Sequence, residues 1–391
     1  MMRKVGFLFV AIFSIAFTCS KGICQESILW GTLEKGKYNV GLKVIEHRDQ
    51  SRFIDSGKAA RPMQTLVWYP AIAGIWDTSV LYQDYISLIA SEKAFHNDSD
   101  SSKQAAIVAY SRLLTSNGIS DEAAKQLLTT KMAAYQNAQA ETGHFPCIIV
   151  AQGNMNPAGS MSVLCEYLAS HGYYVASSPS PMRITGPLTN TTQAYQYARD
   201  QELDMKFDWN ELKAFKNADT KDVAIIGYSF GGRGAFLMLN DNPGIKAFVS
   251  LDGGFADKIG KSWLHGIHID KEKITSPILH FYQDTETYVV PDFNLVNSLI
   301  NSNRYLIKID NMRHALFSNM GMAVGTIPGI DFPGTKKGDV KQKCEFIYRG
   351  TLAFLNNFVK GKKNYFWLKV TDDSTANDDF VTVKELKIGQ E

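Results

Sequence analysis

The sequence predicts an α/β protein with a mostly parallel central sheet of about eight strands and helices on both faces. Two observations lead to this fold class. From residue 145 onward, short apolar segments alternate with segments of helical periodicity. The apolar segments, such as CIIVA at 147–151 and DVAIIG at 222–227, lack the alternating polar residues of a solvent-facing strand. Such strands are buried on both faces, as they are when crossover helices cover a parallel sheet.

The predicted elements follow one another along the chain. Strands are expected at 38–46, 63–69, 147–151, 173–177, 222–227, 246–251, 277–282 and 305–309. Helices are expected at 159–172, 192–216, from 231 onward, at 289–301 and at 343–359. Residues 71–142 are rich in Ala, Gln, Ser and Lys with helical spacing, which predicts a helical insertion. We therefore expect one domain over 25–391, with a polar C-terminal tail at 362–391.

The N-terminus resembles a secretory signal. Arg3 and Lys4 form a basic start, and an apolar run over 5–17 follows them. This run is too short to span a bilayer comfortably, so no transmembrane helix is expected in the mature chain. Residues 1–24 are thus predicted to be a signal peptide of a secreted or periplasmic protein. Anchoring as a lipoprotein through Cys19 is the alternative, although the residues before this cysteine are a poor lead-in.

The overall composition excludes several partners and cofactors. Hydrophobic residues make up 45% of the 391 residues and the net charge is +2, without a long Lys/Arg block. This balance provides a large core and argues against nucleic acid as a partner. Removal of the signal leaves three cysteines, too few and too irregular for a disulfide framework. The histidines of HGIH at 265–268 lack a third convergent ligand, so neither a metal nor another cofactor is expected. The sequence carries no signal for the oligomeric state.

Ser229 is the first candidate for catalysis. It lies in Gly227-Tyr228-Ser229-Phe230-Gly231, after an apolar strand and before a helical segment. A nucleophile elbow needs this order, because glycines two positions on either side allow strand and helix to pass very close. The following helix also directs its N-terminal N–H groups toward the serine. A phosphate-binding loop would need a Lys-Ser or Lys-Thr pair after the glycines, which is absent.

A serine nucleophile needs a histidine base and an acid that orients it. On a sheet of this type these residues follow the serine in the order acid, then histidine, at the carboxyl ends of strands. His314 comes just after the last predicted strand and is the best base. Asp252 ends the strand after the serine, whereas Asp284 and Glu286 follow the strand after that. By position alone the three carboxylates are nearly equal candidates for the acid.

Five segments carry a family resemblance: RPMQTLVWYPA (61–71), the long stretch from FPCIIVAQG to SSPSP (145–181), GYSFGGRGAF (227–236), VSLDGGF (249–255) and MRHALF (312–317). They resemble the platelet-activating factor acetylhydrolase-like branch of the α/β-hydrolases, close to the dienelactone-hydrolase-like esterases. The resemblance covers roughly residues 38–320 and implies the α/β-hydrolase fold. It assigns the roles of nucleophile, acid and base to Ser229, Asp252 and His314, and so favours Asp252 over the two later carboxylates.

The resemblance also implies an oxyanion hole made by the backbone N–H groups of Phe230 and Asn154. Gln152 stands where relatives usually have histidine at the start of the Asn154 loop, and it can hold this loop by hydrogen bonds. Gln152, Tyr228 and Trp76 are the candidate residues for contact with substrate. Trp76 opens the predicted insertion, where an aromatic residue can line an acyl pocket or simply pack in the core.

Together these features predict a secreted serine hydrolase that cleaves carboxylic esters of a small molecule or lipid, acting as an esterase, lipase or acetylhydrolase-like enzyme. The reaction would proceed through an acyl-enzyme. Two alternatives remain at this stage. One is a peptidase or polyesterase that uses the same residues, since elbow chemistry does not separate esters from amides. The other is a secreted binding protein that keeps the fold without catalysis.

Overall fold

A computed structural model describes residues 27–54, 57–72, 74, 77–264, 267–362 and 379–390. The predicted signal peptide, with Cys19, lies outside the described residues, as does His265. The strands are β1 (Asn39–Ile54), β2 (Ala59–Ile72), β3 (Ser79–Leu81), β4 (Lys131–Gln136), β5 (Gln139–Ala140), β6 (Phe145–Ala151), β7 (Tyr174–Ser177), β8 (Ala218–Tyr228), β9 (Ala247–Leu251), β10 (Ile278–Tyr282), β11 (Arg304–Ile309) and β12 (Val381–Leu386). The helices are α1 (Tyr82–Ser87), α2 (Asp100–Ser116), α3 (Asp121–Leu128), α4 (Ser162–Ser170), α5 (Pro181–Thr185), α6 (Thr191–Leu212), α7 (Gly231–Asp241), α8 (Lys258–Trp263), α9 (Asn294–Asn297), α10 (Asn319–Thr326) and α11 (Lys337–Phe358).

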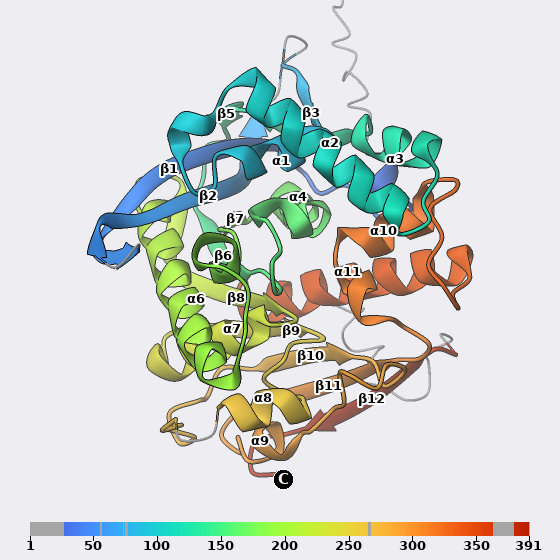
Figure 1. Cartoon of the computed structure of the whole chain (residues 1–391). Coiled ribbons are helices and arrows are strands. Elements are labelled where there is room, and N and C mark those ends of the chain that lie inside the picture. Colours follow the sequence, from blue (N-terminus) through green and yellow to red (C-terminus); the bar gives the residue numbers. More distant parts are fainter. Residues whose placement is uncertain are drawn as a thin grey trace, which may run out of the picture.

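The described strands form one sheet, which runs through the centre of the molecule (Figure 1). Its order is β12-β11-β10-β9-β8-β6-β7-β2-β1-β4-β3, and β5 pairs with β2. From β7 to β11 in this order each neighbouring pair is parallel, whereas β1, β2 and β12 join through antiparallel pairs. The carboxyl ends of the parallel strands therefore lie at one edge, where α/β sheets place their ligand sites.

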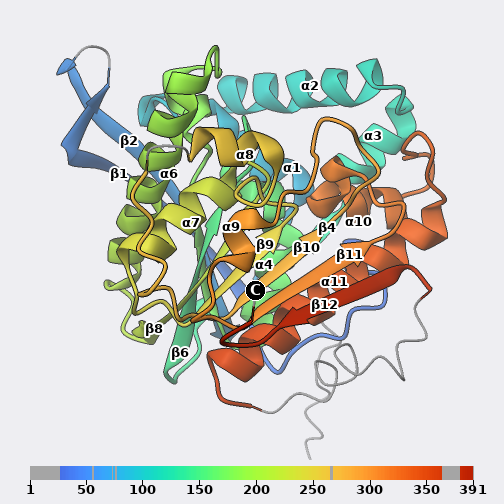
Figure 2. The same cartoon turned by 90° about the horizontal axis from the view of Figure 1, so that it is seen from below.

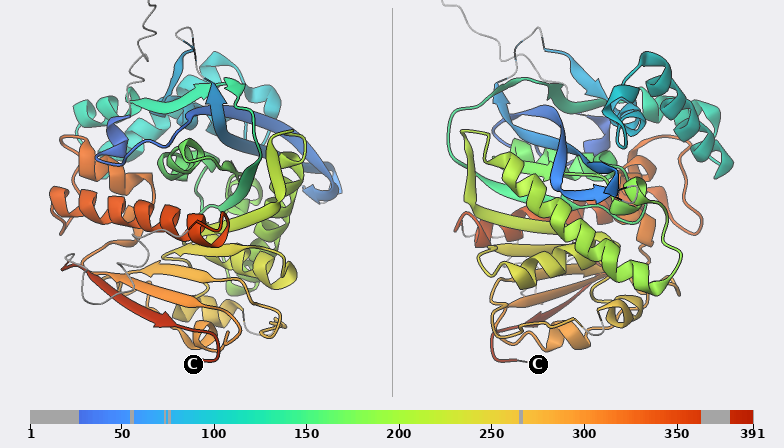
Figure 3. Two further views of the ribbon diagram at one scale, coloured as in Figure 1. Left: turned by 180° about the vertical axis from the view of Figure 1, so that it is seen from behind. Right: turned by 60° about the vertical axis from the view of Figure 1, so that its left-hand side comes forward.

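Helices cover both faces of the sheet, as predicted. Side chains of α4, α10 and α11 join one apolar core, and those of α6 and α7 join a second core on the opposite face. The two layers lie on either side of the strands in the turned views (Figures 2 and 3). The central strands are buried on both faces, which explains why their sequences are apolar throughout. The predicted α/β-hydrolase architecture is confirmed.

The 71–142 segment differs from the helical insertion predicted for it. It contains α1, α2 and α3, but β4 follows α3 directly and pairs in parallel with β1. The helical spacing that predicted this insertion also included residues 131–135, which form part of β4. In the structure, buried Met132 and Ala134 alternate with the more exposed residues around them, as in a strand.

Two further predictions at the C-terminal side need correction. The polar tail at 362–391 contains β12, which pairs with β11 and continues the sheet. Its residues alternate in exposure on a short edge strand, a weak signal beside the polar residues that precede it. The helix expected at 289–301 is reduced to α9, a single turn at Asn294–Asn297. Among the described residues, no helix combines the length and the apolar character needed to cross a membrane.

The core holds a buried carboxylate on α6, Asp208. Asp208 is 0% exposed and accepts hydrogen bonds from the hydroxyls of Thr65 (2.6 Å) and Ser178 (2.9 Å). Burial away from water raises the pKa of Asp208 to about 8, and the two hydroxyl donors oppose this rise only in part. The stability of the fold is therefore coupled to pH through this side chain.

Candidate active site

Ser229 lies on a sharp turn between β8 and α7. Its φ is +53°, in the left-handed region that non-glycine residues rarely adopt. The turn is compressed: a β-carbon on Gly231 would lie 2.2 Å from the carbonyl oxygen of Ala151. One on Gly227 would lie 2.7 Å from Cα of Gly232. These close approaches explain the glycines of the motif, and they leave Ser229 partly exposed at the carboxyl edge of the sheet.

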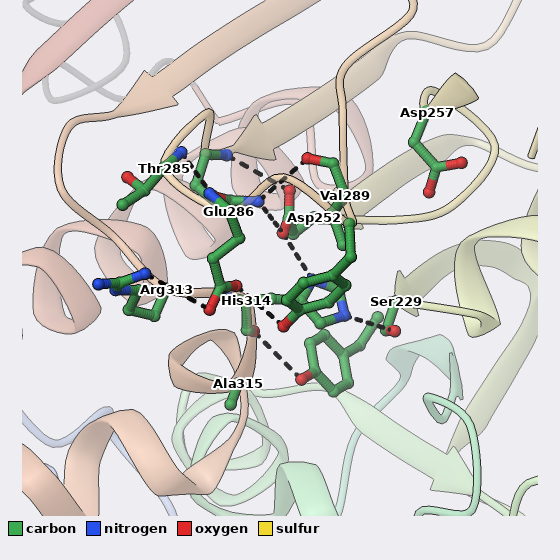
Figure 4. Close-up of polar contacts among 12 residues, drawn as sticks. Ser229, Asp252, Asp257, Thr285, Glu286, Val289, Arg313, His314 and Ala315 are labelled. Atoms are coloured by element: carbon green, nitrogen blue, oxygen red, sulfur yellow. Dashed lines mark hydrogen bonds and ion pairs between the residues drawn. The ribbon is translucent and has the colours of Figure 1, made fainter. Parts of the chain in front are cut away.

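Ser229, His314 and Asp252 form a continuous hydrogen-bonded chain (Figure 4). Ser229 Oγ lies 2.7 Å from His314 Nε2, and His314 Nδ1 lies 2.6 Å from Asp252 Oδ2. A carboxylate can only accept a hydrogen bond, so Nδ1 carries the proton and Nε2 is left to accept the proton of the serine. The side chain of Asp252 is 3% exposed and that of His314 is 14% exposed, so bulk water screens this pair little.

Asp252, Asp284 and Glu286, which were nearly equal candidates by position, have different partners in the structure. Asp252 follows β9 and is the one whose oxygen meets the imidazole. Asp284 is half exposed and pairs with Lys308. Glu286 also reaches His314, but its Oε2 accepts the backbone N–H at 2.7 Å and not a ring nitrogen.

Gln283 is a site residue that the sequence analysis missed. It follows β10 and is 0% exposed. Its backbone N–H lies 3.3 Å from Asp252 Oδ1, and its side-chain Nε2 lies 3.3 Å from Asp252 Oδ2. Both donors support the orientation of the carboxylate toward His314. A glutamine after a strand gives no sequence signal for this task.

The loop after β6 lies against the serine. A β-carbon on Gly153 would lie 3.1 Å from Ser229 Cβ, so the backbone of this loop is in contact with the elbow. Asn154 follows directly and is exposed. Arg183 on α5 holds the next residue, because its Nη1 donates to the carbonyl oxygen of Met155 (3.1 Å). Its Nε donates to the buried carboxylate of Glu92 at 2.5 Å. The loop is thus fixed from the side of the 71–142 segment.

Comparisons with known proteins show which families and structures this chain resembles. The model of the family "Platelet-activating factor acetylhydrolase, isoform II" matches residues 189–377. The platelet-activating factor acetylhydrolase of Cavia porcellus is 26% identical over 42% of this chain and 35% of its own length. A putative carboxymethylenebutenolidase of Methylorubrum extorquens is 30% identical over 31% of this chain and 44% of its own length. The chain thus spans between about a third and a half of the length of these relatives.

A solved structure, the ferulic acid esterase from Streptomyces cinnamoneus, is similar in fold over most of the chain. It is 16% identical, with a TM-score of 0.63, over 89% of this chain and 96% of its own. The protein has the α/β-hydrolase fold, and it is similar to the platelet-activating factor acetylhydrolase-like group. In this α/β-hydrolase the site described above lies where the fold places its nucleophile elbow.

The three residues predicted to contact substrate, Gln152, Tyr228 and Trp76, differ in how the structure describes them. Gln152 is 0% exposed, and its contact with substrate stays a prediction. Its Nε2 donates to the carbonyl oxygen of Ala158 (2.9 Å), at the far end of the Asn154 loop, and to Oγ of Ser177 (2.8 Å) on β7. Tyr228 stacks on His314 with ring centroids 5.6 Å apart and is 5% exposed. A substrate contact by this ring stays a prediction. Trp76 lies outside the described residues.

Proposed function

We propose that this α/β-hydrolase is a serine hydrolase that cleaves carboxylic esters, with Ser229 as nucleophile, His314 as base and Asp252 as acid. The observation that carries the proposal is the chain of hydrogen bonds of 2.7 and 2.6 Å from Ser229 Oγ through His314 to Asp252. A serine hydroxyl is a weak nucleophile, and an adjacent base of this geometry activates it. The names of the relatives, which include acetylhydrolases and cutinases, support an ester substrate.

The reaction would proceed in two halves. His314 Nε2 takes the proton of Ser229 as Oγ attacks the ester carbonyl, and Asp252 stabilises the imidazolium. His314 then gives the proton to the leaving alcohol, and an acyl-enzyme remains on Ser229. Water, activated in turn by His314, attacks the acyl carbon and releases the acid, which regenerates the serine.

The oxyanion of each tetrahedral intermediate would be held by the backbone N–H groups of Phe230 and Asn154. Phe230 begins the turn into α7, whose N-terminus carries a partial positive charge. Gly153 brings the Asn154 loop into contact with the serine. Each such donor contributes about 2.7–4 kcal/mol to lowering the barrier.

We also propose that the chain is exported and that residues 1–24 are removed. The basic start and the short apolar run over 5–17 support this proposal. The mass of the mature protein from its natural host tests it, since cleavage before Gln25 leaves a defined N-terminus. A mass increased by acyl chains on a new N-terminus at Cys19 would instead identify a lipoprotein.

Labelling with a fluorophosphonate probe tests the proposed chemistry. The wild-type protein should be labelled at Ser229 and should hydrolyse p-nitrophenyl esters, whereas Ser229→Ala should do neither. A series of rising acyl length measures the pocket, and a peptide p-nitroanilide and a polyester film separate esterase, peptidase and polyesterase activity. If the folded wild-type protein is neither labelled nor active, the hydrolase proposal is wrong and the alternative of a binding protein with this fold is favoured.

A further inference from the structure

Side chains hold both backbone polar groups of His314. Its N–H donates to Glu286 Oε2 at 2.7 Å, and its carbonyl oxygen accepts from the hydroxyl of Tyr228 at 3.2 Å. His314 begins a short 3-10 turn between β11 and α10, so no strand ladder fixes its backbone. The place of the base therefore depends on these two side-chain contacts as well as on the ring contact with Asp252.

Glu286 is itself held by Gln283. The Oε1 of Gln283 accepts the backbone N–H groups of Thr285 (2.7 Å) and Glu286 (2.8 Å). The other end of the same amide, Nε2, lies 3.3 Å from Asp252 Oδ2 and 3.4 Å from the carbonyl oxygen of Val289. Figure 4 shows these contacts converging between the acid and the loop that follows β10. Because Gln283 is fully buried, water does not compete for them.

Of the two acidic residues after β10, Glu286 contacts the backbone of His314 and Asp284 does not. Glu286 has a side chain that is 11% exposed and also accepts from the hydroxyl of Tyr288 at 2.9 Å. Asp284, two residues earlier, is 52% exposed and pairs with Lys308 at the surface. Of these two acidic residues after β10, one thus faces the base and the other faces solvent.

We propose that Gln283 and Glu286 are positioning residues, a bridge that fixes the acid and the base of this site relative to each other. This inference rests on the proposed function. Neither residue takes part in proton transfer. Gln283 orients Asp252 and the 285–289 loop, and Glu286 transmits that position to the backbone of His314. Such residues act on the reacting geometry and not on the affinity for substrate, so their loss should lower kcat and leave KM nearly unchanged.

The test uses the full-length mature enzyme and a p-nitrophenyl ester. Glu286→Ala removes the acceptor for the His314 N–H and should lower kcat by about ten- to a hundredfold, with KM within about twofold. Glu286→Gln keeps an oxygen at this place and should recover kcat to within about threefold of wild type. Asp284→Asn is the matched control and should have the activity of wild type. If Glu286→Ala does not fold, Glu286→Asp replaces it, because the shorter side chain withdraws the oxygen from the N–H.

A double-mutant cycle tests the link between the two residues. Gln283→Ala should lower kcat to a similar degree, and combining it with Glu286→Ala should cost less than the product of the two single losses. Losses that multiply independently would refute the bridge. A kcat within twofold of wild type for Glu286→Ala, or a Glu286→Gln enzyme as slow as Glu286→Ala, would refute the role of Glu286.

Failure of this inference is distinguishable from failure of the proposed function. Fluorophosphonate labelling and the Ser229→Ala variant test the function in the wild-type background, before any change at 283 or 286. If wild type is labelled and turns over while the Glu286 variants behave like Asp284→Asn, the bridge is refuted and the function stands.

Discussion

Replacement of Asp252 by asparagine should abolish turnover through the tautomer of His314. Two donors from Gln283 already face this side chain, its N–H at Oδ1 and its Nε2 at Oδ2, both at 3.3 Å. If the asparagine oxygen keeps the Gln283 N–H, its NH₂ group faces His314 Nδ1. Nδ1 must then accept, the ring proton moves to Nε2, and Nε2 can no longer take the proton of Ser229. Either orientation sets the NH₂ group against one Gln283 donor, Nε2 in the first case and the backbone N–H in the second. The side-chain amide can adjust more readily than the backbone N–H, so the first orientation is expected.

The expected loss in kcat is about 10⁴-fold, the size associated with a wrong tautomer in a Ser-His-Asp triad. It corresponds to about 5.4 kcal/mol in the barrier. Asparagine and aspartate have nearly the same shape, so the variant should fold and keep KM within a fewfold range. Initial rates with a p-nitrophenyl ester give kcat and KM, and circular dichroism verifies the fold.

Two comparisons make the experiment decisive for the acid. Asp284→Asn should retain wild-type activity because Asp284 contacts Lys308 and not the imidazole. The reasoning is wrong if folded Asp252→Asn keeps more than about a tenth of the wild-type kcat. It is equally wrong if Asp284→Asn loses activity to the degree expected of Asp252→Asn.

Three further predictions follow from contacts outside the proposed triad. Gly231→Ala should lower the free energy of unfolding by about 3 kcal/mol in urea titrations, since its β-carbon would lie 2.2 Å from the carbonyl oxygen of Ala151; an unchanged midpoint would contradict the close approach. Arg183→Met leaves the buried carboxylate of Glu92 without its partner and should cost about 1–3 kcal/mol, much of it restored by adding Glu92→Gln. Below about pH 4, Asp208 is protonated in both the folded and the unfolded protein. Between pH 4 and 8 only the unfolded chain releases this proton, so the free energy of unfolding falls by about 1.4 kcal/mol per pH unit as the pH rises. Unfolding free energies at pH 5 and pH 8 should therefore differ less in Asp208→Asn than in wild type.

The proposed nucleophile and base could be selected from the sequence because their signals are local or depend on chain order. Ser229 needs a strand, a turn with glycines and a helix, all of which are adjacent in the sequence. His314 follows β11, the last strand that the sequence predicted. The acid could not be separated from Asp284 and Glu286 in this way, because all three follow neighbouring parallel strands and their side-chain directions depend on the tertiary structure. The resemblance to a family, and not position, favoured Asp252.

The missed elements share a different physical cause. β4 and β12 are short strands outside the central part of the sheet, and their exposure alternates. Their pairing partners, β1 and β11, lie far from them in the sequence, so no local pattern records the pairing. Gln283 was missed for the same reason. Its amide gains a role only when the ends of β9 and β10 lie side by side.

The proposed triad is divided between two parts of the molecule. The N–H of Ser229 donates to the carbonyl oxygen of Leu251, and the N–H of Gly254 donates to the carbonyl oxygen of Ser229. Serine and acid are thus tied by their own backbones, while the histidine arrives on a separate turn held by side chains. Mild heating or denaturant should therefore abolish the proposed activity by releasing the turn at His314–Phe317 while the sheet is still intact. Such a protein loses activity before it loses structure, and regains activity when the turn closes again.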